Sequence, residues 1–377
     1  MPASHAINWL VGIGLLVISS AGSLFVAEFG VRLFVDPVDY LLPVVVQDPM
    51  LGHRMAGGTG GHDEWGFRNY ELPGSAEIVA IGDSMTYGIS ARASESWPAI
   101  LAQLTGRTTY NIGLGGYGPL QYFYLLRERA LTLKPKAAVV GFYFGNDLVD
   151  VVKLAYGNDN WARYRIAGLN GTGEQGGVVI DQPEIGGGRL LGGPRSYLAR
   201  HSVLYRLATS LPVLDRFRTV NTASTDPGLF VFSMGDRTTI LFPGQGRLRM
   251  DIDNPQIEAA LTITERALLE MKDVSTKANV GLYFLLLPTK ELVYADLLAE
   301  HHQLAASPDL EPALRNEREI RKRLFAFLEA SHLTYIDPLP AMTSAVRDHE
   351  IYPFNDGHPN GAGYRLIAEQ VAGALRD

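Results

Sequence analysis

Apolar and polar positions follow two alternating patterns along most of the chain after residue 76. Short apolar runs, typical of buried strands, alternate with longer segments in which apolar residues recur every three or four positions, as in amphipathic helices. The short runs predict strands at 77–81, 109–112, 137–144, 281–287 and 334–336. The longer segments predict helices at 97–104, 120–133, 255–272, 314–331 and 362–375. Strands that alternate with helices indicate an α/β fold whose parallel sheet is covered on both faces.

The segment 151–254 interrupts this alternation. Its weaker patterns predict one helix at 196–211 and two strands at 229–232 and 238–242. Clustered glycines favour irregular structure, and we interpret the whole segment as an insertion into the α/β domain. The glycines gather between Gly168 and Gly193 and include Gly171, Gly173, Gly176, Gly177 and Gly186–Gly188.

The first thirty residues are dominated by one apolar segment. Residues 7–27 contain no ionisable side chain, and these 21 residues are enough to cross the core of a bilayer as a helix. We therefore interpret residues 1–30 as an uncleaved membrane anchor. Two alternatives stay open: a signal peptide cleaved near Ser19-Ser20-Ala21, or a buried core helix. Few charged residues flank the segment, so charge does not encode its orientation in a membrane.

The segment 31–75 is rich in proline and glycine between Pro37 and Gly61. This composition is typical of turns and linkers, and it predicts a linker and lead-in with irregular structure. The chain then has three parts: an anchor at 1–30, a linker and lead-in at 31–75, and an α/β domain at 76–377 that the insertion interrupts at about 151–254.

Composition narrows the classes of function. The chain has 377 residues, of which 46% are hydrophobic and 10% aromatic, so it can bury a large core and most of it is expected to fold. Its 33 Lys and Arg against 40 Asp and Glu give a net charge of −7, which argues against nucleic acid as a partner. The absence of cysteine excludes disulfides, thiolate metal sites and cysteine nucleophiles. Its nine histidines show no ligand spacing, so we predict no metal and no other cofactor.

The sharpest local motif follows the first predicted strand and reads Gly82-Asp83-Ser84. In open α/β sheets the reactive crevice lies beyond the carboxyl ends of the strands, which suits Ser84 as a nucleophile. Backbone N–H groups at the start of the following helix would face a developing oxyanion. The alternative interpretation is a simple helix cap, because serine and aspartate both favour that position.

A hydroxyl nucleophile needs a base, and the sequence Asp356-Gly357-His358 stands just before the last predicted helix. This loop follows the final strand and can return to the same edge of the sheet. An aspartate two residues before a histidine can accept its Nδ1 hydrogen and leave Nε2 facing Ser84. Turn and cap chemistry is the alternative interpretation of this motif. The pair His301-His302 lies in a polar stretch and is interpreted as surface.

Two further polar turns follow strands at the same predicted edge. The glycine-rich stretch 113–118, which contains Gly116, follows the second strand, and Gly145-Asn146-Asp147 follows the third. A glycine lets a backbone N–H approach a reacting oxygen, and an asparagine amide supplies another donor. Ordinary turn geometry is the alternative for both. A second Gly-Asn-Asp at 157–159 follows no strand, and we treat it as a decoy.

The ordered set Gly82-Asp83-Ser84, Gly116, Gly145-Asn146-Asp147 and Asp356-Gly357-His358 resembles the SGNH (GDSL-type) hydrolase superfamily. The resemblance covers about residues 60–150 and 280–377. It implies a flavodoxin-like three-layer α/β/α sandwich and metal-free acyl transfer.

The same resemblance implies a role for each matching residue. Ser84 would be the nucleophile, His358 the general base and Asp356 the group that orients the base. The oxyanion hole would consist of the N–H groups of Ser84 and Gly116 and the side chain of Asn146. Gly82, Asp83 and Asp147 would support these motifs. One departure concerns the orienting group, because the commonest family pattern has aspartate three residues before the histidine, where this chain has Asn355.

Two shorter stretches extend the resemblance. The lead-in 65–69 (WGFRN) and Gln121 look like the membrane-anchored bacterial branch, which is often associated with envelope polysaccharides. Residues 284–294 (FLLLPTKELVY) look like part of the SGNH-like alginate O-acetyltransferases, or else are an ordinary buried strand ended by proline.

These resemblances lead to one expected function and two alternatives. We expect an ester hydrolase, tethered by a single-pass anchor in the cell membrane, whose domain faces the periplasm or the exterior. Its expected substrates are O-acyl groups of envelope or exported carbohydrate. The alternatives are a polysaccharide O-acetyltransferase of the same fold and a non-catalytic carbohydrate-binding or scaffolding protein. The sequence does not encode the oligomeric state.

Overall fold

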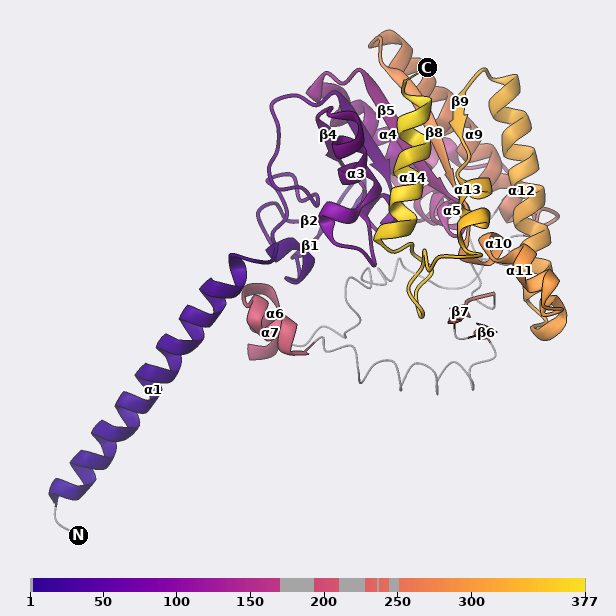
Figure 1. Cartoon of the computed structure of the whole chain (residues 1–377). Helices are drawn as coiled ribbons and strands as arrows, with labels where there is room; N and C mark the ends of the chain where they lie inside the picture. The colour runs from indigo at the N-terminus through magenta and orange to yellow at the C-terminus, as the bar shows by residue number, and fades with distance from the viewer. Residues whose placement is uncertain (1–2, 170–192, 210–227, 236, 244–250, 377) are drawn as a thin grey trace.

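The computed structural model describes residues 3–169, 193–209, 228–235, 237–243 and 251–376. Most of the predicted glycine-rich run, from Gly171 to Gly188, lies outside the described residues, as do the last two residues of the helix predicted at 196–211. Helix α1 (Ala3–Arg32) projects from an α/β body, and the C-terminus lies at the far side of that body (Figure 1).

The central sheet has five parallel strands, as the alternation predicts. The strands lie in the order β4-β3-β5-β8-β9, which is the order of a flavodoxin-like sheet. The strand order reverses at β3, and in open α/β sheets ligands bind beyond the carboxyl ends of the strands at such a switch point. The strand bounds are β3 (Ile78–Gly82), β4 (Thr109–Asn111), β5 (Ala137–Tyr143), β8 (Gly281–Leu287) and β9 (Thr334–Ile336).

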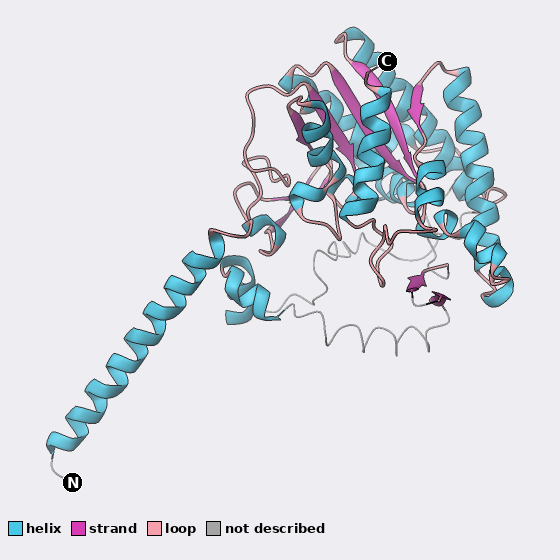
Figure 2. Ribbon diagram, viewed as in Figure 1, coloured by secondary structure: helices cyan, strands magenta, loops and turns pink. Residues whose placement is uncertain are grey.

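Helices cover both faces of this sheet (Figure 2), and two hydrophobic cores lie between the sheet and these helices. Along β3, Val79 and Ile81 belong to one core and Ile78 and Ala80 to the other, because successive side chains of a strand point to opposite faces. The first core is closed by α4 (Pro119–Glu128), α5 (Asp147–Gly157) and α9 (Pro255–Lys277), and the second by α3 (Trp97–Thr105) and α14 (Gly361–Ala374). The flavodoxin-like three-layer prediction is therefore confirmed. Helix α12 (Leu310–Ala330) contributes to both cores.

Several element boundaries differ from the sequence pattern. The helix predicted at 120–133 ends as α4 at Glu128 and continues as the 3-10 helix η3 (Ala130–Leu133). The helix predicted at 196–211 is two helices, α6 (Pro194–His201) and α7 (Val203–Thr209), separated at Ser202. Helix α5 was not predicted. The remaining short helices are α2 (Ser84–Tyr87), η2 (Ala93–Glu95), η4 (Asp159–Tyr164), α10 (Lys290–Val293), α11 (Ala295–Glu300), η6 (Leu304–Ala306) and α13 (Leu339–Ala345).

The lead-in contains regular structure where none was predicted. It forms the 3-10 helix η1 (Pro37–Asp39) and the antiparallel hairpin β1 (Val45–Asp48) and β2 (Gly52–Met55). Further along, Asn69 makes two hydrogen bonds with the backbone of Asn111, at the end of β4. The lead-in is thus attached to the carboxyl edge of the sheet.

The described part of the insertion reaches the same edge. Its hairpin, β6 (Phe230–Met234) and β7 (Arg237–Leu241), matches the two predicted strands. The backbone N–H of Ile240 donates to the carbonyl of Phe354 at 2.8 Å. The insertion therefore packs directly beside the loop that leads to His358.

Candidate active site

The turn after β3 presents Ser84 as the first residue of helix α2. A Cβ on Gly82 would lie 2.1 Å from Oγ1 of Thr86, so only glycine fits this turn. The carboxylate of Asp83 accepts the backbone N–H of Met85 at 2.9 Å and thereby caps the helix. Because Asp83 is the cap, the hydroxyl of Ser84 is left for other partners.

The structure brings Ser84 together with His358 and Asp356. Oγ of Ser84 lies 2.9 Å from Nε2 of His358. Nδ1 of His358 lies 2.6 Å from Oδ1 of Asp356, which also accepts the backbone N–H of His358 at 2.9 Å. The side chains of His358 and Asp356 are 20% and 32% exposed, so solvent reaches the site. Ser84 and His358 are 274 positions apart in sequence and meet at one sheet edge.

Hydrogen bonding keeps Asp356 ionised. Burial acts to raise its pKa, but the hydrogen bonds from His358 and Ser90 outweigh burial and hold the pKa at about 2. An ionised Asp356 accepts the Nδ1 hydrogen of His358 and leaves Nε2 free to accept from Ser84. Asn355, at the position where the commonest family pattern has aspartate, is exposed.

Two buried carboxyl groups lie behind the turns. Burial raises the pKa of Asp83 to about 6. Burial, together with the negative charge of Asp83, raises the pKa of Asp147 well above its ordinary range. Asp147 accepts the backbone N–H of Tyr143 and the hydroxyl of Tyr122, both at 3.0 Å. Asp147 thus fixes the turn at the end of β5, and Asp83 fixes the turn at the end of β3.

Gly116 lies in the loop that follows β4, with a left-handed φ of +77°. This loop packs against both neighbouring turns. A Cβ on Gly113 would lie 2.6 Å from the backbone nitrogen of Tyr87 in α2, and one on Gly118 would lie 3.3 Å from the carbonyl oxygen of Asp147 in α5. From the lead-in, Nε2 of His53 lies 3.1 Å from the carbonyl oxygen of Gly115. The loop is therefore held in place on three sides.

Asn146 is the last residue before α5. Its Nδ2 donates to Oδ2 of Asp150 at 2.6 Å. An amide nitrogen carries two hydrogens, so this bond fixes the orientation of the side chain and leaves one hydrogen for another acceptor. Asn146 therefore lies in the turn after β5, the strand next to β3, at the carboxyl edge of the sheet.

Sequence reasoning did not single out Lys290, which is completely buried behind the loop that carries His358. Its Nζ donates to the carbonyls of Pro353 and Asp356 at 3.0 and 2.9 Å. Burial lowers its pKa to about 8. The sequence did contain a signal for this role, because Lys290 follows the buried strand β8 by three residues. A lysine that is buried near a sheet edge needs hydrogen-bond acceptors there.

The aromatic residues near the motifs and His301 have packing roles. The aromatic residues near the motifs are buried in the cores: Trp97, Tyr87, Tyr117 and Tyr143. The ring of His301 packs edge-on against Phe232. Within the described ranges, no group of three or more His, Asp or Glu side chains is placed to hold a metal ion.

No protein-family model and no curated protein matches the chain. Solved structures similar to it include a member of the lipolytic protein G-D-S-L family from Veillonella parvula, with 12% identity, a TM-score of 0.38 and coverage of 79% of this chain and 97% of that one. A GDSL-like lipase from Bacteroides thetaiotaomicron has 11% identity and a TM-score of 0.36, over 79% of this chain and 87% of that one. A catalytic mutant of an acetylxylan esterase from Geobacillus stearothermophilus has 11% identity and a TM-score of 0.40, over 80% and 95%.

Proposed function

We propose that the protein is a serine ester hydrolase that works through an acyl-enzyme. One observation carries this proposal: the hydrogen bonds that join Oγ of Ser84 to His358 and His358 to an ionised Asp356. A nucleophile, a base within hydrogen-bond reach and a group that orients the base are the parts that acyl transfer by serine requires.

In the first half of the reaction, Oγ of Ser84 attacks the ester carbonyl carbon while Nε2 of His358 accepts the hydroxyl proton. The negative charge on the carbonyl oxygen is stabilised by the N–H groups of Ser84 and Gly116 and by the amide of Asn146. His358 then donates its proton to the departing alcohol oxygen, and the ester C–O bond breaks. The acyl group remains on Ser84.

In the second half, His358 accepts a proton from water as the water oxygen attacks the acyl carbon. The same donors stabilise the second oxyanion, and the bond to Oγ of Ser84 breaks as His358 returns the proton to it. The products are a carboxylic acid and the free enzyme. Asp356 stays ionised throughout and stabilises the protonated imidazole.

The natural substrates we propose are O-acyl groups of envelope or exported carbohydrate. Helix α1 would anchor the chain in the cell membrane, followed by the lead-in 31–75 and by the hydrolase domain on the outer face. By length and composition, residues Trp9–Arg32 could cross a bilayer, and no other described helix passes the same test. The apolar side chains of this helix are exposed, which suits a lipid environment.

The first test is p-nitrophenyl acetate hydrolysis by the full chain in detergent, compared with its Ser84→Ala variant. We expect turnover in the parent and a loss of at least about 10³-fold in the variant. Labelling by a fluorophosphonate, mapped to Ser84 by mass spectrometry, reports the nucleophile independently of the substrate. Equal hydrolysis in both folded proteins, with no label on Ser84, would overturn the proposal.

The acceptor is tested with the same enzyme. If water is the acceptor, acetate accumulates at the rate of p-nitrophenol release when an oligosaccharide is added. An acetylated oligosaccharide, seen by mass, would assign the protein to the O-acetyltransferases instead.

A further inference from the structure

The hydroxyl of Ser90 makes a hydrogen bond that the proposed mechanism does not use. It donates to Oδ2 of Asp356, while Oδ1 of the same carboxylate accepts from the imidazole and backbone of His358. Both carboxylate oxygens are therefore occupied by donors. A carboxylate held through one oxygen can rotate about its Cβ–Cγ bond, whereas one held through both cannot.

The backbone of Ser90 has an uncommon conformation. Its φ is +66°, in the left-handed region that residues other than glycine, asparagine and aspartate rarely adopt. Gly88, two residues earlier, has a φ of +87°. The loop from Gly88 therefore turns sharply, and this turn points the hydroxyl of Ser90 toward Asp356. Strain of this kind persists only where surrounding contacts impose it.

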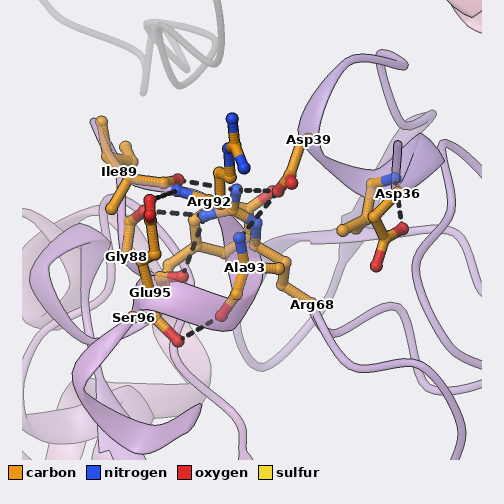
Figure 3. Close-up of polar contacts among 12 residues, drawn as sticks. Asp36, Asp39, Arg68, Gly88, Ile89, Arg92, Ala93, Glu95 and Ser96 are labelled. Atoms are coloured by element: carbon orange, nitrogen blue, oxygen red, sulfur yellow. Dashed lines mark hydrogen bonds and ion pairs between the residues drawn. The ribbon is translucent and has the colours of Figure 1, made fainter. Parts of the chain in front are cut away.

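Those contacts come from Arg68 in the lead-in (Figure 3). Its Nη1 donates to the carbonyl of Gly88 at 2.7 Å and its Nη2 to the carbonyl of Ala91 at 3.0 Å, one on each side of Ser90. Oδ1 of Asp39 accepts from Nη2 of Arg68 and from the backbone N–H of Ala93, both at 2.7 Å. The side chains of Arg68 and Asp39 are only 7% and 12% exposed.

We propose that Ser90 is a positioning residue of this active site, which fixes the carboxylate of Asp356 and through it the imidazole of His358. The Arg68–Asp39 ion pair holds the loop in the conformation that presents the hydroxyl. This inference rests on the proposed hydrolase function and deepens it. It assigns to the lead-in, which precedes the α/β domain, a part in aligning the site.

Loss of the hydroxyl should lower kcat and leave KM unchanged, because the hydroxyl of Ser90 acts on the reaction only through Asp356 and His358 in this proposal. Ser90 is exposed, so water can partly replace it. A hydrogen bond to a charged group is stronger than one between neutral groups, and partial replacement by water limits the expected drop in kcat to about three- to tenfold.

Two substitutions separate positioning from stability. Ser90→Gly removes the hydroxyl but suits a positive φ, so its thermal midpoint should stay within about 2 °C of the parent. Ser90→Thr keeps the hydroxyl but puts a branched side chain in the left-handed region, so its midpoint should fall by about 4 °C. We expect kcat and the rate of fluorophosphonate labelling to fall in Ser90→Gly and to be retained in Ser90→Thr. Ser90→Gly would then be the more stable but less active variant, and Ser90→Thr the less stable but more active one.

The measurements use the full chain in detergent, with Ser94→Gly as the matched control in the same segment. Ser94 is exposed, and the same chemical change there should leave kcat and labelling unchanged. If Ser84→Ala abolishes turnover but Ser90→Gly matches the parent, the positioning role is wrong and the hydrolase function stands. If activity in the two Ser90 variants follows their thermal midpoints, Ser90 is merely structural. If Ser84→Ala retains turnover, the hydrolase proposal fails first.

Discussion

At the scale of single residues, the hydroxyl hydrogen of Ser84 has two acceptors. Nε2 of His358 lies at 2.9 Å and Oδ2 of Asp83 at 3.3 Å, and a hydroxyl can donate to only one of them at a time. The shorter distance favours His358, toward which the proton must move for attack. Asp83 is buried and already accepts the N–H of Met85, so its contribution is to hold the turn.

The amide of Asn146 should matter for chemistry more than for binding. Asp150 fixes its orientation, and the second hydrogen of Nδ2 is free to stabilise an oxyanion. Losing one such donor lowers kcat on the order of 10²–10³-fold. We therefore expect Asn146→Ala to lose that factor in kcat on p-nitrophenyl acetate while KM changes little, as measured by steady-state kinetics.

The chain contains its own control for this variant, because the tripeptide Gly-Asn-Asp recurs at 157–159. There Asn158 caps the 3-10 helix η4, and its Nδ2 donates to the carbonyl of Pro49. Asn158→Ala should leave kcat unchanged in the folded protein. Equal losses in the two variants would mean that Asn146 acts on the fold and contributes no oxyanion donor.

The difference between these two tripeptides also shows what could be predicted from sequence. The position of Ser84, Asn146 and His358 at one sheet edge could be predicted, because each stands close after a strand or before a helix, and the strand ends of a parallel sheet share one edge. Ser90 could not be found, because its partner Asp356 is 266 residues away and no local pattern links them. Its left-handed φ likewise depends on carbonyl contacts made by Arg68.

At the scale of elements, the start of the short helix α10 rests on a carboxyl group from α12. Glu317 accepts the backbone N–H of Thr289 at 3.1 Å and also the hydroxyl of the same residue. Thr289 in turn caps α10, whose first residue, Lys290, holds the loop of His358. Burial raises the pKa of Glu317 to about 7. The buried network behind the site therefore titrates near neutral pH.

This pKa makes the stability of the protein depend on pH. A carboxyl group whose pKa is higher in the folded state than in the unfolded state stabilises the fold below its unfolded pKa of about 4.5, and that contribution is lost as pH rises through about 7. A difference of this size corresponds to roughly 3 kcal/mol. We expect Glu317 to contribute a fall in the free energy of unfolding between pH 4.5 and 8, against an opposite contribution from His62, whose pKa burial lowers to about 4. Glu317→Gln should remove most of the Glu317 contribution, as measured by urea denaturation across that range.

Glu319→Gln is the matched control, because Glu319 is exposed on the same helix and should leave the pH dependence unchanged. The pKa values of Asp83 and Asp147 are also raised, so these two groups also make the free energy of unfolding fall as pH rises. The Glu317→Gln variant should retain their contribution. Parallel curves for the parent and Glu317→Gln would show that Glu317 does not titrate in this range.

Strands and helices could be predicted from the sequence where the apolar residues on one or both of their faces form an unbroken pattern. The buried strands β3, β5 and β8 could be placed within one or two residues from their apolar runs. Helix α5 could not, because it begins with Asp147, whose carboxyl group turns inward to Tyr122 and Tyr143 and so disguises the apolar face. The hairpin β1–β2 was hidden by the surrounding prolines and glycines, and it depends on contacts with the loop of Gly116.

At the scale of the whole molecule, helix α1 exposes an apolar surface, although the α/β domain has closed cores of its own. Among the described residues, only the C-terminal end of α1 makes polar contacts with α7, where Glu28 accepts the backbone N–H groups of Val203 and Leu204. Apolar side chains of α1 from Trp9 to Phe29 are exposed, and no residue of its candidate span is buried. A soluble protein rarely exposes so continuous an apolar surface. The lead-in after it, however, is tied to the α/β domain, because Arg68 donates to the carbonyls of Gly88 and Ala91 and Asp39 accepts the backbone N–H of Ala93. The proposed boundary between the anchor and the hydrolase domain therefore follows α1, which ends at Arg32.

This boundary predicts how two forms of the protein behave. The full chain should remain in the membrane fraction after an alkaline carbonate wash, whereas a fragment that starts at residue 31 should be soluble. Because the fragment retains Asp39 and Arg68, it should hydrolyse p-nitrophenyl acetate within about twofold of the kcat of the full chain, since the alignment of the site is unchanged. Mass spectrometry of the expressed full chain checks the N-terminus in the same samples. A mature chain that begins just after Ala21 and is released by the wash would identify the segment as a signal peptide and contradict the anchor.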